Sequence, residues 1–529
     1  MRPLGAAVLV ERPGRAVFNG EQAAVVKTLS RGALAAAIDF ACREPGKVLA
    51  VILGIHLLVW TVLPILICPN LQLDLVDDLA LGKEWQLGYW KHPPLPWWAA
   101  EAAYRLTGQI DSVYLLGPLA VVICIYAVWL LARETVGAFA GLIAVLVLEG
   151  VHYYNFSTVK FGHDQMLLPF WAFAGLFFYR ALKRGRTLDW ALAGVFLAGA
   201  FWSKYAAFVL AGTLGLFLLA DPLARRAWRT SGPYVMAISF MVVIAPNVWW
   251  LVGHDFLPFQ YVDAHAKIAV GWYQYISYPL QWVGSQAFNL LPAAALLAFV
   301  FPGAKGAERD ISAAAAFDRR YVTWLALGPF LLTTFIAAAL GRLVITRWGF
   351  PLWSFAPLAW LLWFKPATEM RLLQRFTAGF VAVFVAVPIM YAAVEIGEPF
   401  VRDRPKATQF SGRALADIVT RDWHRRFDTP LIYVGGNEFL ANNIAVYSPD
   451  RPHVIVHAQP ELSPWIDKAD LRRRGAVLVW RQGLGVADIE KLKATYGDID
   501  IQPELRLPRQ TWYPRRPNLM GYAVVPPRP

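Results

Sequence analysis

The loop that decides the fold opens with Leu73-Asp74-Leu75-Val76-Asp77-Asp78 and closes with Lys91-His92-Pro93-Pro94-Leu95-Pro96-Trp97-Trp98. It follows an apolar run at 48–67 that is long enough to cross a bilayer, which takes about 20 residues. The three carboxylates are spaced i, i+3 and i+4, so a helix would place them on one face. The adjacent prolines are expected to end that helix, and the tryptophans suit a membrane interface. The stretch therefore predicts a folded acidic loop, with amphipathic helices, that rests on a membrane domain.

The composition is that of a polytopic membrane protein. Of the 529 residues, 57% are hydrophobic and only 16% are charged, whereas a soluble domain carries about 25% charged residues. The 23 tryptophans fit aromatic belts at two interfaces. A net charge of +13 would suggest a nucleic-acid partner in a soluble protein. Here 22 of the 50 Lys and Arg residues fall in predicted cytoplasmic loops, so the membrane interpretation explains the charge and we expect no nucleic-acid partner.

Apolar windows predict about eleven membrane spans. They lie at 48–68, 112–131, 136–154, 165–182, 188–203, 205–220, 233–252, 276–300, 321–341, 350–364 and 373–394. The predicted cytoplasmic segments hold 22 Lys and Arg residues, and the opposite short loops hold far fewer. Because cytoplasmic loops are enriched in basic residues, the acidic loop is predicted to face outward.

The chain is predicted to belong to the mainly α fold class and to have three parts. They are a cytoplasmic tail at 1–47, a transmembrane domain at 48–395 with its outer loop at 69–110, and a C-terminal domain at 396–529. An odd number of spans places the C-terminal domain outside as well. Its short β-type runs alternate with helix-like segments at 413–426, 436–446 and 486–496, which predicts a small α/β domain.

Charged and polar residues gather in the other predicted outward loops. Asp164 opens the fourth span, Lys204 lies at the turn between the fifth and sixth, and His254 ends the seventh. Arg342 and Arg347 flank a short loop before the tenth span. A basic residue near a span end usually snorkels to the interface. The turn around Lys204 is too apolar for a generic loop, which favours a functional role there.

Purely structural roles stay open for several of these positions. Asp74 could be only a helix N-cap, and Asp78 is expected to be a solvated helix face or cap. His163 and His254 could be interfacial histidines whose hydrogen bonds are satisfied. Gly435-Gly436-Asn437 lacks the spacing of a phosphate loop, so it predicts an ordinary turn.

The acidic loop resembles the first extracytoplasmic loop of bacterial polyprenyl-phosphate-sugar glycosyltransferases. These form the protein O-mannosyltransferase and aminoarabinose transferase branch of the C-type glycosyltransferase fold. Alignment on the Pro-Pro pair places Asp74 on the family's catalytic acid, and Asp77, one turn on, would supply the second carboxylate that Leu75 replaces. Further similarities follow in order, so the resemblance covers about 48–365. They are His163-Asp164, Ser203-Lys204-Tyr205, Pro246-Asn247 through His254-Asp255, and the segment from Arg347 to Pro351.

The resemblance implies an inverting transfer of a sugar from a polyprenyl-phosphate donor to an acceptor hydroxyl, at the periplasmic face of a bacterial inner membrane. Asp74 would be the general base. The site residues implied are Asp74, Asp164 and Asp77 for catalysis, Lys204, Arg347 and Arg342 for the donor phosphate, and Lys91, His92 and His254 for substrate. No cofactor is certain; a divalent metal at His92, His254 or Asp77 is left open.

The sequence leaves the sugar and the acceptor open. The expected partners are the lipid-linked donor, membrane lipids, and an envelope glycolipid such as lipid A, a glycan or a protein. The main alternative is a polytopic transporter or lipid-linked-sugar flippase, which would also carry intramembrane charges. Two halves of similar pattern would favour a transporter, and the sequence does not show them. A third candidate is an assembly subunit whose acidic loop only binds partners.

Overall fold

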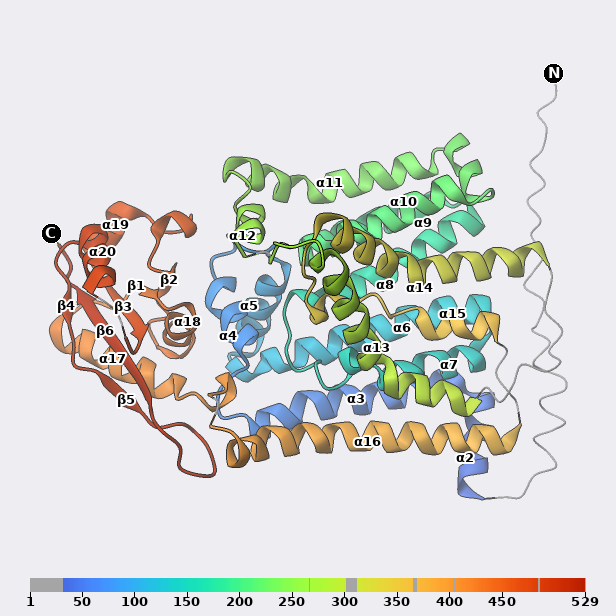
Figure 1. The fold of residues 1–529 in the computed structure, drawn as a ribbon, viewed down its shortest axis with the longest axis horizontal. Coiled ribbons are helices and arrows are strands. Elements are labelled where there is room, and N and C mark those ends of the chain that lie inside the picture. The colour runs from blue at the N-terminus through green and yellow to red at the C-terminus, as the bar shows by residue number, and fades with distance from the viewer. Residues whose placement is uncertain are drawn as a thin grey trace.

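Long helices running side by side form a bundle, and a small α/β domain lies against one end of it (Figure 1). This computed structural model describes residues 32–265, 267–300, 312–364, 369–403, 405–483 and 486–528. Most of the predicted tail at 1–47 lies outside the described residues. Its described part comprises α2 (Ala33–Arg43) and the start of α3 (Pro45–Ile67). In Figure 1, α2 lies at the end of the bundle opposite the α/β domain.

Each predicted apolar window coincides with a helix in the described part of the chain. After α3 these are α6 (Leu116–Thr135), α7 (Ala138–Val147), α8 (His163–Arg184), α9 (Thr187–Ser203), α10 (Phe208–Ala220), α11 (Gly232–Gly253), α13 (Gln274–Val300), α14 (Ala313–Leu340), α15 (Ala356–Trp363) and α16 (Met370–Val401). Six helical segments of the described chain are long and apolar enough to cross a membrane, and three shorter ones are apolar. The predicted fold class is thus confirmed, whereas the number of spans stays a prediction.

Small residues bring the central helices close together. α8 packs against α6 and α9, and α9 also packs against α11. A Cβ built on Gly199 would lie 2.2 Å from the ring of Phe170, and one on Gly194 would lie 2.2 Å from the Met236 carbonyl. Close backbone approach of this kind is how helices associate where the hydrophobic effect cannot drive them. The result is a fixed scaffold for the ends of α8 and α9.

The acidic loop folds into two helices above the bundle, α4 (Leu73–Gly82) and α5 (Leu95–Thr107). The predicted helix at Asp74 is confirmed. The prediction that the prolines end it is wrong, because α4 stops at Gly82, where a Cβ would lie 2.2 Å from the Trp97 carbonyl. Pro94 instead caps α5, where the missing N–H of a proline costs nothing.

A mixed sheet forms the centre of the C-terminal domain. Its strands are β1 (Tyr433–Gly436), β2 (His453–Val456), β3 (Ala476–Arg481), β4 (Asp500–Ile501), β5 (Leu505–Leu507) and β6 (Asn518–Val525). The order is β2-β1-β3-β6-β4, with β1 parallel to β2 and β3, and β6 antiparallel to β3, β4 and β5. The helices are α17 (Gly412–Arg426), α18 (Glu438–Tyr447), α19 (Lys468–Arg474) and α20 (Val486–Tyr496). One apolar core joins α18 and the sheet to α4 and α5, so the domain is docked on the acidic loop.

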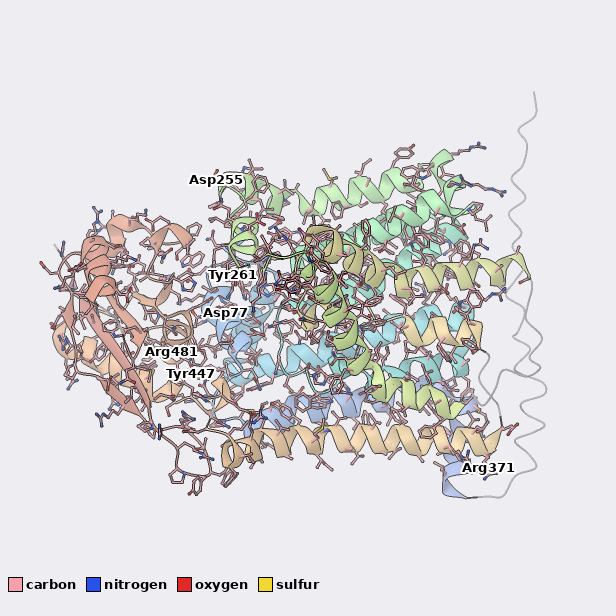
Figure 2. The ribbon with its side chains drawn as sticks, viewed as in Figure 1. Asp77, Asp255, Tyr261, Arg371, Tyr447 and Arg481 are labelled. Carbon is pink, nitrogen blue, oxygen red and sulfur yellow. The ribbon has the colours of Figure 1, made fainter. Side chains whose placement is uncertain are left out.

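The arrangement gives the topology a direct test. Asp77 lies where the bundle meets the α/β domain, and Arg371 lies at the opposite end (Figure 2). In a protein without its three native cysteines, an impermeant thiol reagent is expected to label Lys468→Cys in intact spheroplasts and to leave Arg371→Cys unlabelled, because basic loops stay cytoplasmic. Labelling of Arg371→Cys before lysis would overturn the outward orientation of the acidic loop.

Candidate active site

Four segments distant in sequence bring two carboxylates and two cations together. Arg347, in the short helix η6 (Thr346–Gly349), donates from Nη2 to Asp74 Oδ2 and from Nε to Asp164 Oδ2, each at 3.0 Å. The ammonium of Lys204 pairs with the other oxygen of Asp164. Its Nζ also lies 5.4 Å from the centre of the Trp348 ring. The four charged residues therefore form one connected ion-pair network.

Local structure explains why these side chains meet. Asp164 lies in the first turn of α8, where the helix dipole favours a carboxylate, and Lys204 caps the C-terminus of α9, where it favours a cation. Gly162, just before α8, packs on α4: a Cβ built there would lie 3.7 Å from the Cβ of Asp74. The start of α8 and the first turn of α4 are therefore in contact.

The network has a buried side and an open side. The side chains of Asp164 and Lys204 are 2% and 9% exposed, whereas those of Asp74 and Arg347 are 32% and 48% exposed. Asp74 is not the N-cap of α4, since that position is Gln72. A substrate would therefore meet Asp74 and Arg347 first, with the pair of Asp164 and Lys204 behind them.

The two predicted arginines separate in the structure. Arg342 pairs with Asp263 at 2.7 Å and is a third exposed, whereas Arg347 bridges Asp74 and Asp164. Of the two arginines, Arg347 is thus the one that the structure joins to Asp74 and Asp164 by ion pairs. We therefore leave Arg342 out of the proposed phosphate site.

Asp77 belongs to a second cluster, which includes the C-terminal domain. Lys91 Nζ lies 2.9 Å from Asp77 Oδ2 and 2.6 Å from Glu438 Oε1, and Asn442 Nδ2 donates to Asp77 Oδ1 at 2.9 Å. Glu438 and Asn442 are both on α18 and were missed by the sequence analysis. No local pattern marks them, because their role depends on docking across more than 340 residues.

Burial controls the charge state of this cluster. It raises the pKa of Asp77 to about 6, against the opposing effect of Lys91 and with the help of Glu438. The two carboxylates outweigh the effect of burial on Lys91 and raise the pKa of its ammonium. The expectation that Asp78 is solvated is wrong: it is 1% exposed. Burial, with the charges of Asp77 and Asp74, raises the pKa of Asp78 well above its usual range.

The predicted histidines lie against aromatic rings or other histidines. His92 and His163 have ring centroids 4.1 Å apart, and His163 Nε2 donates to the Pro93 carbonyl at 3.2 Å. Burial lowers the pKa of His92 well below its usual range, and the neighbouring His163 lowers it further. His254 stacks on Trp250 at 4.2 Å. His92 and His163 therefore pack beneath the Pro-Pro turn, and His254 packs on α11.

The residues considered for a metal each have another partner in the structure. Asp77 is paired with Lys91, His92 stacks on His163, and His254 stacks on Trp250. The described residues contain no group of three or more His, Cys, Asp or Glu that could hold a metal ion. We derive no step through a metal.

The end of α11 holds the acidic loop in place. Asn247 Nδ2 donates to the Leu87 carbonyl at 2.7 Å. Trp250 packs on Gly88, where a Cβ would lie 2.2 Å from its ring. These contacts account for Pro246-Asn247 being part of the ordered resemblance.

The sequence analysis also missed an ionisable pair within the helical bundle. His56 in α3 lies 2.9 Å from Glu149, between Nδ1 and Oε1, and both are buried. Ionisable residues inside predicted spans are the signal that could have found it.

Comparisons with known proteins find similarity in part of the sequence and in the fold. Residues 91–250 match the family described as dolichyl-phosphate-mannose-protein mannosyltransferase. The lipid A galacturonosyltransferase RgtD of Rhizobium johnstonii is 33% identical over 178 residues, which are 32% of this chain and 36% of that protein. The chain thus aligns with about a third of the length of that curated relative. The crystal structure of ArnT from Cupriavidus metallidurans bound to undecaprenyl phosphate has 13% identity and a TM-score of 0.51, over 89% of this chain and 97% of that chain.

These findings confirm the predicted resemblance. The helical bundle with its acidic loop is a C-type glycosyltransferase fold in a multi-pass membrane protein. The match to the mannosyltransferase family covers residues 91–250, and the likeness to ArnT extends over 89% of the chain at the level of the fold.

The cluster around Lys91 yields a prediction on stability. Lys91→Met leaves Asp77 and Glu438 facing each other without a cation, so stability at pH 7.5 should fall by about 3 kcal/mol, as when one partner of a buried ion pair is removed. Burial already raises the pKa of Asp77 to about 6, and the variant loses the opposing effect of Lys91, so the folded state binds more protons than the unfolded chain and stability rises as pH falls. Thermal unfolding at pH 7.5 and pH 5 measures both effects.

Lys468→Met is the matched control, because Lys468 pairs with Glu461 on the surface and both are more than half exposed. Exposed pairs contribute about 0–1 kcal/mol. Equal melting of Lys91→Met and Lys468→Met at pH 7.5 would contradict the role given to Lys91.

Proposed function

We propose that the protein transfers a sugar from a polyprenyl phosphate to the hydroxyl of an envelope glycolipid, at the outer face of the inner membrane. The acceptor oxygen attacks the anomeric carbon of the donor as Asp74 takes the hydroxyl proton. The bond from the anomeric carbon to the phosphate oxygen breaks, and the polyprenyl phosphate leaves with the bonding electrons. A single displacement of this kind inverts the anomeric centre.

The observation that carries this proposal is the double ion pair of Arg347 to Asp74 and Asp164. A half-exposed guanidinium beside a partly exposed carboxylate offers a base and an anion site on one open face. The departing phosphate gains negative charge, which a preorganised cation stabilises. Arg347 would hold two phosphate oxygens as a fork, and Lys204 would add charge from behind.

The buried carboxylate Asp164 has a positioning role in this scheme. It neutralises Lys204 and fixes the orientation of Arg347 through its two oxygens. When a phosphate displaces part of this network, the cations are already in place. Asp77, held by Lys91, supports the helix that carries Asp74.

The names of the relatives support the choice of substrates. One relative is a lipid A galacturonosyltransferase, and the solved structure with the same fold holds undecaprenyl phosphate. We therefore propose a polyprenyl-phosphate-linked sugar as donor and a lipid A-type glycolipid as acceptor. The sugar itself stays open between hexose, uronic acid and amino-pentose.

A deletion strain tests the function in the cell. Mass spectrometry of its envelope glycolipids is expected to show the loss of one sugar mass, which returns with the wild-type gene and fails to return with Asp74→Asn. An unchanged glycolipid profile would contradict a glycolipid acceptor.

The sidedness of the accumulated donor separates this proposal from a flippase. Without the transferase, the lipid-linked sugar should accumulate on the outer leaflet, where an impermeant periodate reagent oxidises it in spheroplasts. Accumulation only on the inner leaflet would indicate that the protein moves the donor across the membrane.

A further inference from the structure

The sheet of the C-terminal domain has a topological switch point. The chain leaves β1 through α18 to reach β2 on one side, and β3 lies on the other side of β1. Apolar side chains of α18 share a core with Val434 and Val479, whereas those of α20 share a core with Leu478 on the opposite face. The helices that follow β1 and β3 therefore diverge to opposite faces (Figure 1). In open α/β sheets such divergence opens a crevice at the carboxyl ends of the strands, where ligands bind.

A cavity occupies this position. It has a volume of about 580 Å³, within the roughly 300–1,000 Å³ of small-molecule sites. Gly436 and Asn437 at the end of β1, and Val479 and Trp480 at the end of β3, contribute to its wall. The strand order and the cavity are independent observations that indicate the same site.

The lining of the cavity suits a saccharide. Its polar side chains include Asn437, Gln459, Asp488, Lys491 and Thr495. Amides, a hydroxyl and one charge of each sign offer donors and acceptors for several sugar hydroxyls. The indole of Trp480 lies over Gly521, where a Cβ would be 2.1 Å from its Nε1, and offers an aromatic surface at the crevice. The described residues of the lining include one lysine, Lys491, and no arginine, so they do not form the cationic cluster of a nucleotide or polyphosphate site.

The crevice borders the acidic loop. His457, which lines it, contacts the ring of Trp90 with centroids 5.2 Å apart. Asn437 is followed by Glu438, which pairs with Lys91 and through it with Asp77 on α4. A ligand in the crevice would thus lie close to the part of the acidic loop that contains Trp90 and Lys91.

We propose that this crevice binds the saccharide of the acceptor glycolipid and presents it to the catalytic face. This inference rests on the proposed function for the identity of the ligand. It adds an acceptor site in the C-terminal domain, apart from the cations that hold the donor. The domain would then act in substrate selection as well as in supporting α4.

Binding of deacylated lipid A to the purified full-length protein tests the site. Saturation-transfer NMR should detect binding to the wild type and equally to Asp74→Asn, because Asp74 does not line the crevice. The double variant Gln459→Ala, Lys491→Ala should bind about tenfold more weakly, the effect of losing one or two hydrogen bonds. Both side chains are exposed, so folding should be unaffected.

Lys493→Ala is the matched control, since Lys493 is exposed on the same helix but does not line the crevice. In turnover assays the double variant should raise KM for the acceptor about tenfold and leave KM for the donor and kcat unchanged. The proposal would be overturned if the wild type did not bind deacylated lipid A, or if the double variant bound it as tightly as the wild type. Failure of turnover in the wild type, with saccharide binding retained, would instead contradict the proposed function alone.

Discussion

Asp74→Asn is expected to lower kcat by about 10²-fold or more, the usual contribution of a general base. The amide keeps the shape of the side chain and still accepts from Arg347, but it cannot take the acceptor proton. Binding of the donor and the acceptor should change little, because neither depends on proton transfer. Steady-state kinetics in detergent with both substrates saturating measures the effect.

Asp78→Asn is the matched control on the same helix. Burial raises the pKa of Asp78 well above its usual range and so disfavours its charged form, and an amide has the shape and the charge of the neutral carboxyl group. Its turnover should stay within a few-fold of the wild type. Similar losses of turnover in both variants would mean that α4 tolerates no change. Near-normal turnover in Asp74→Asn would show that Asp74 is not the base.

Arg347→Met is expected to have the second large effect, a loss of about 10²–10³-fold in kcat/KM for the donor. The change removes the cation proposed to meet the phosphate and leaves Asp74, which repels it, without the ion pair to Arg347. Because charge on the phosphate grows in the transition state, kcat should fall as well as KM rise. Arg347→Lys should recover only part of the loss, since an ammonium cannot act as a fork.

Two further variants locate the phosphate site. Lys204→Met should also raise the donor KM and lower kcat, with the acceptor KM unchanged. Arg342→Met should have a small effect, because Arg342 pairs with Asp263 at the surface. If Arg342→Met were as damaging as Arg347→Met, the phosphate would lie nearer to Arg342 than we propose.

Most of the bundle could be predicted from the sequence because lipid imposes a simple requirement. A membrane-crossing helix must satisfy its own backbone hydrogen bonds and be apolar over its length. Windows at 188–203 and 205–220 therefore found α9 and α10 although both helices are short. The end of α4 was misplaced because proline was taken as the stop, whereas close packing of Gly82 on Trp97 ends the helix.

The candidate site was only partly predictable. Asp74, Asp164, Lys204 and Arg347 stood out because each is a charge at the end of an apolar segment. Helical spacing placed Asp74, Asp77 and Asp78 on one helix. It could not predict which of the three carboxylates the rest of the protein would bury. That depends on α5 and on the docking of α18, which brings Glu438 to Lys91. No local pattern encodes a contact of that range.

The most direct test of the account follows both products in one vessel. Purified protein in proteoliposomes receives a polyprenyl phosphate bearing a radiolabelled sugar, together with lipid A. The account predicts that label appears in lipid A as polyprenyl phosphate is released in equal amount, and that Asp74→Asn slows both by about 10²-fold or more. Movement of the donor across the bilayer without label in lipid A or release of polyprenyl phosphate would contradict it.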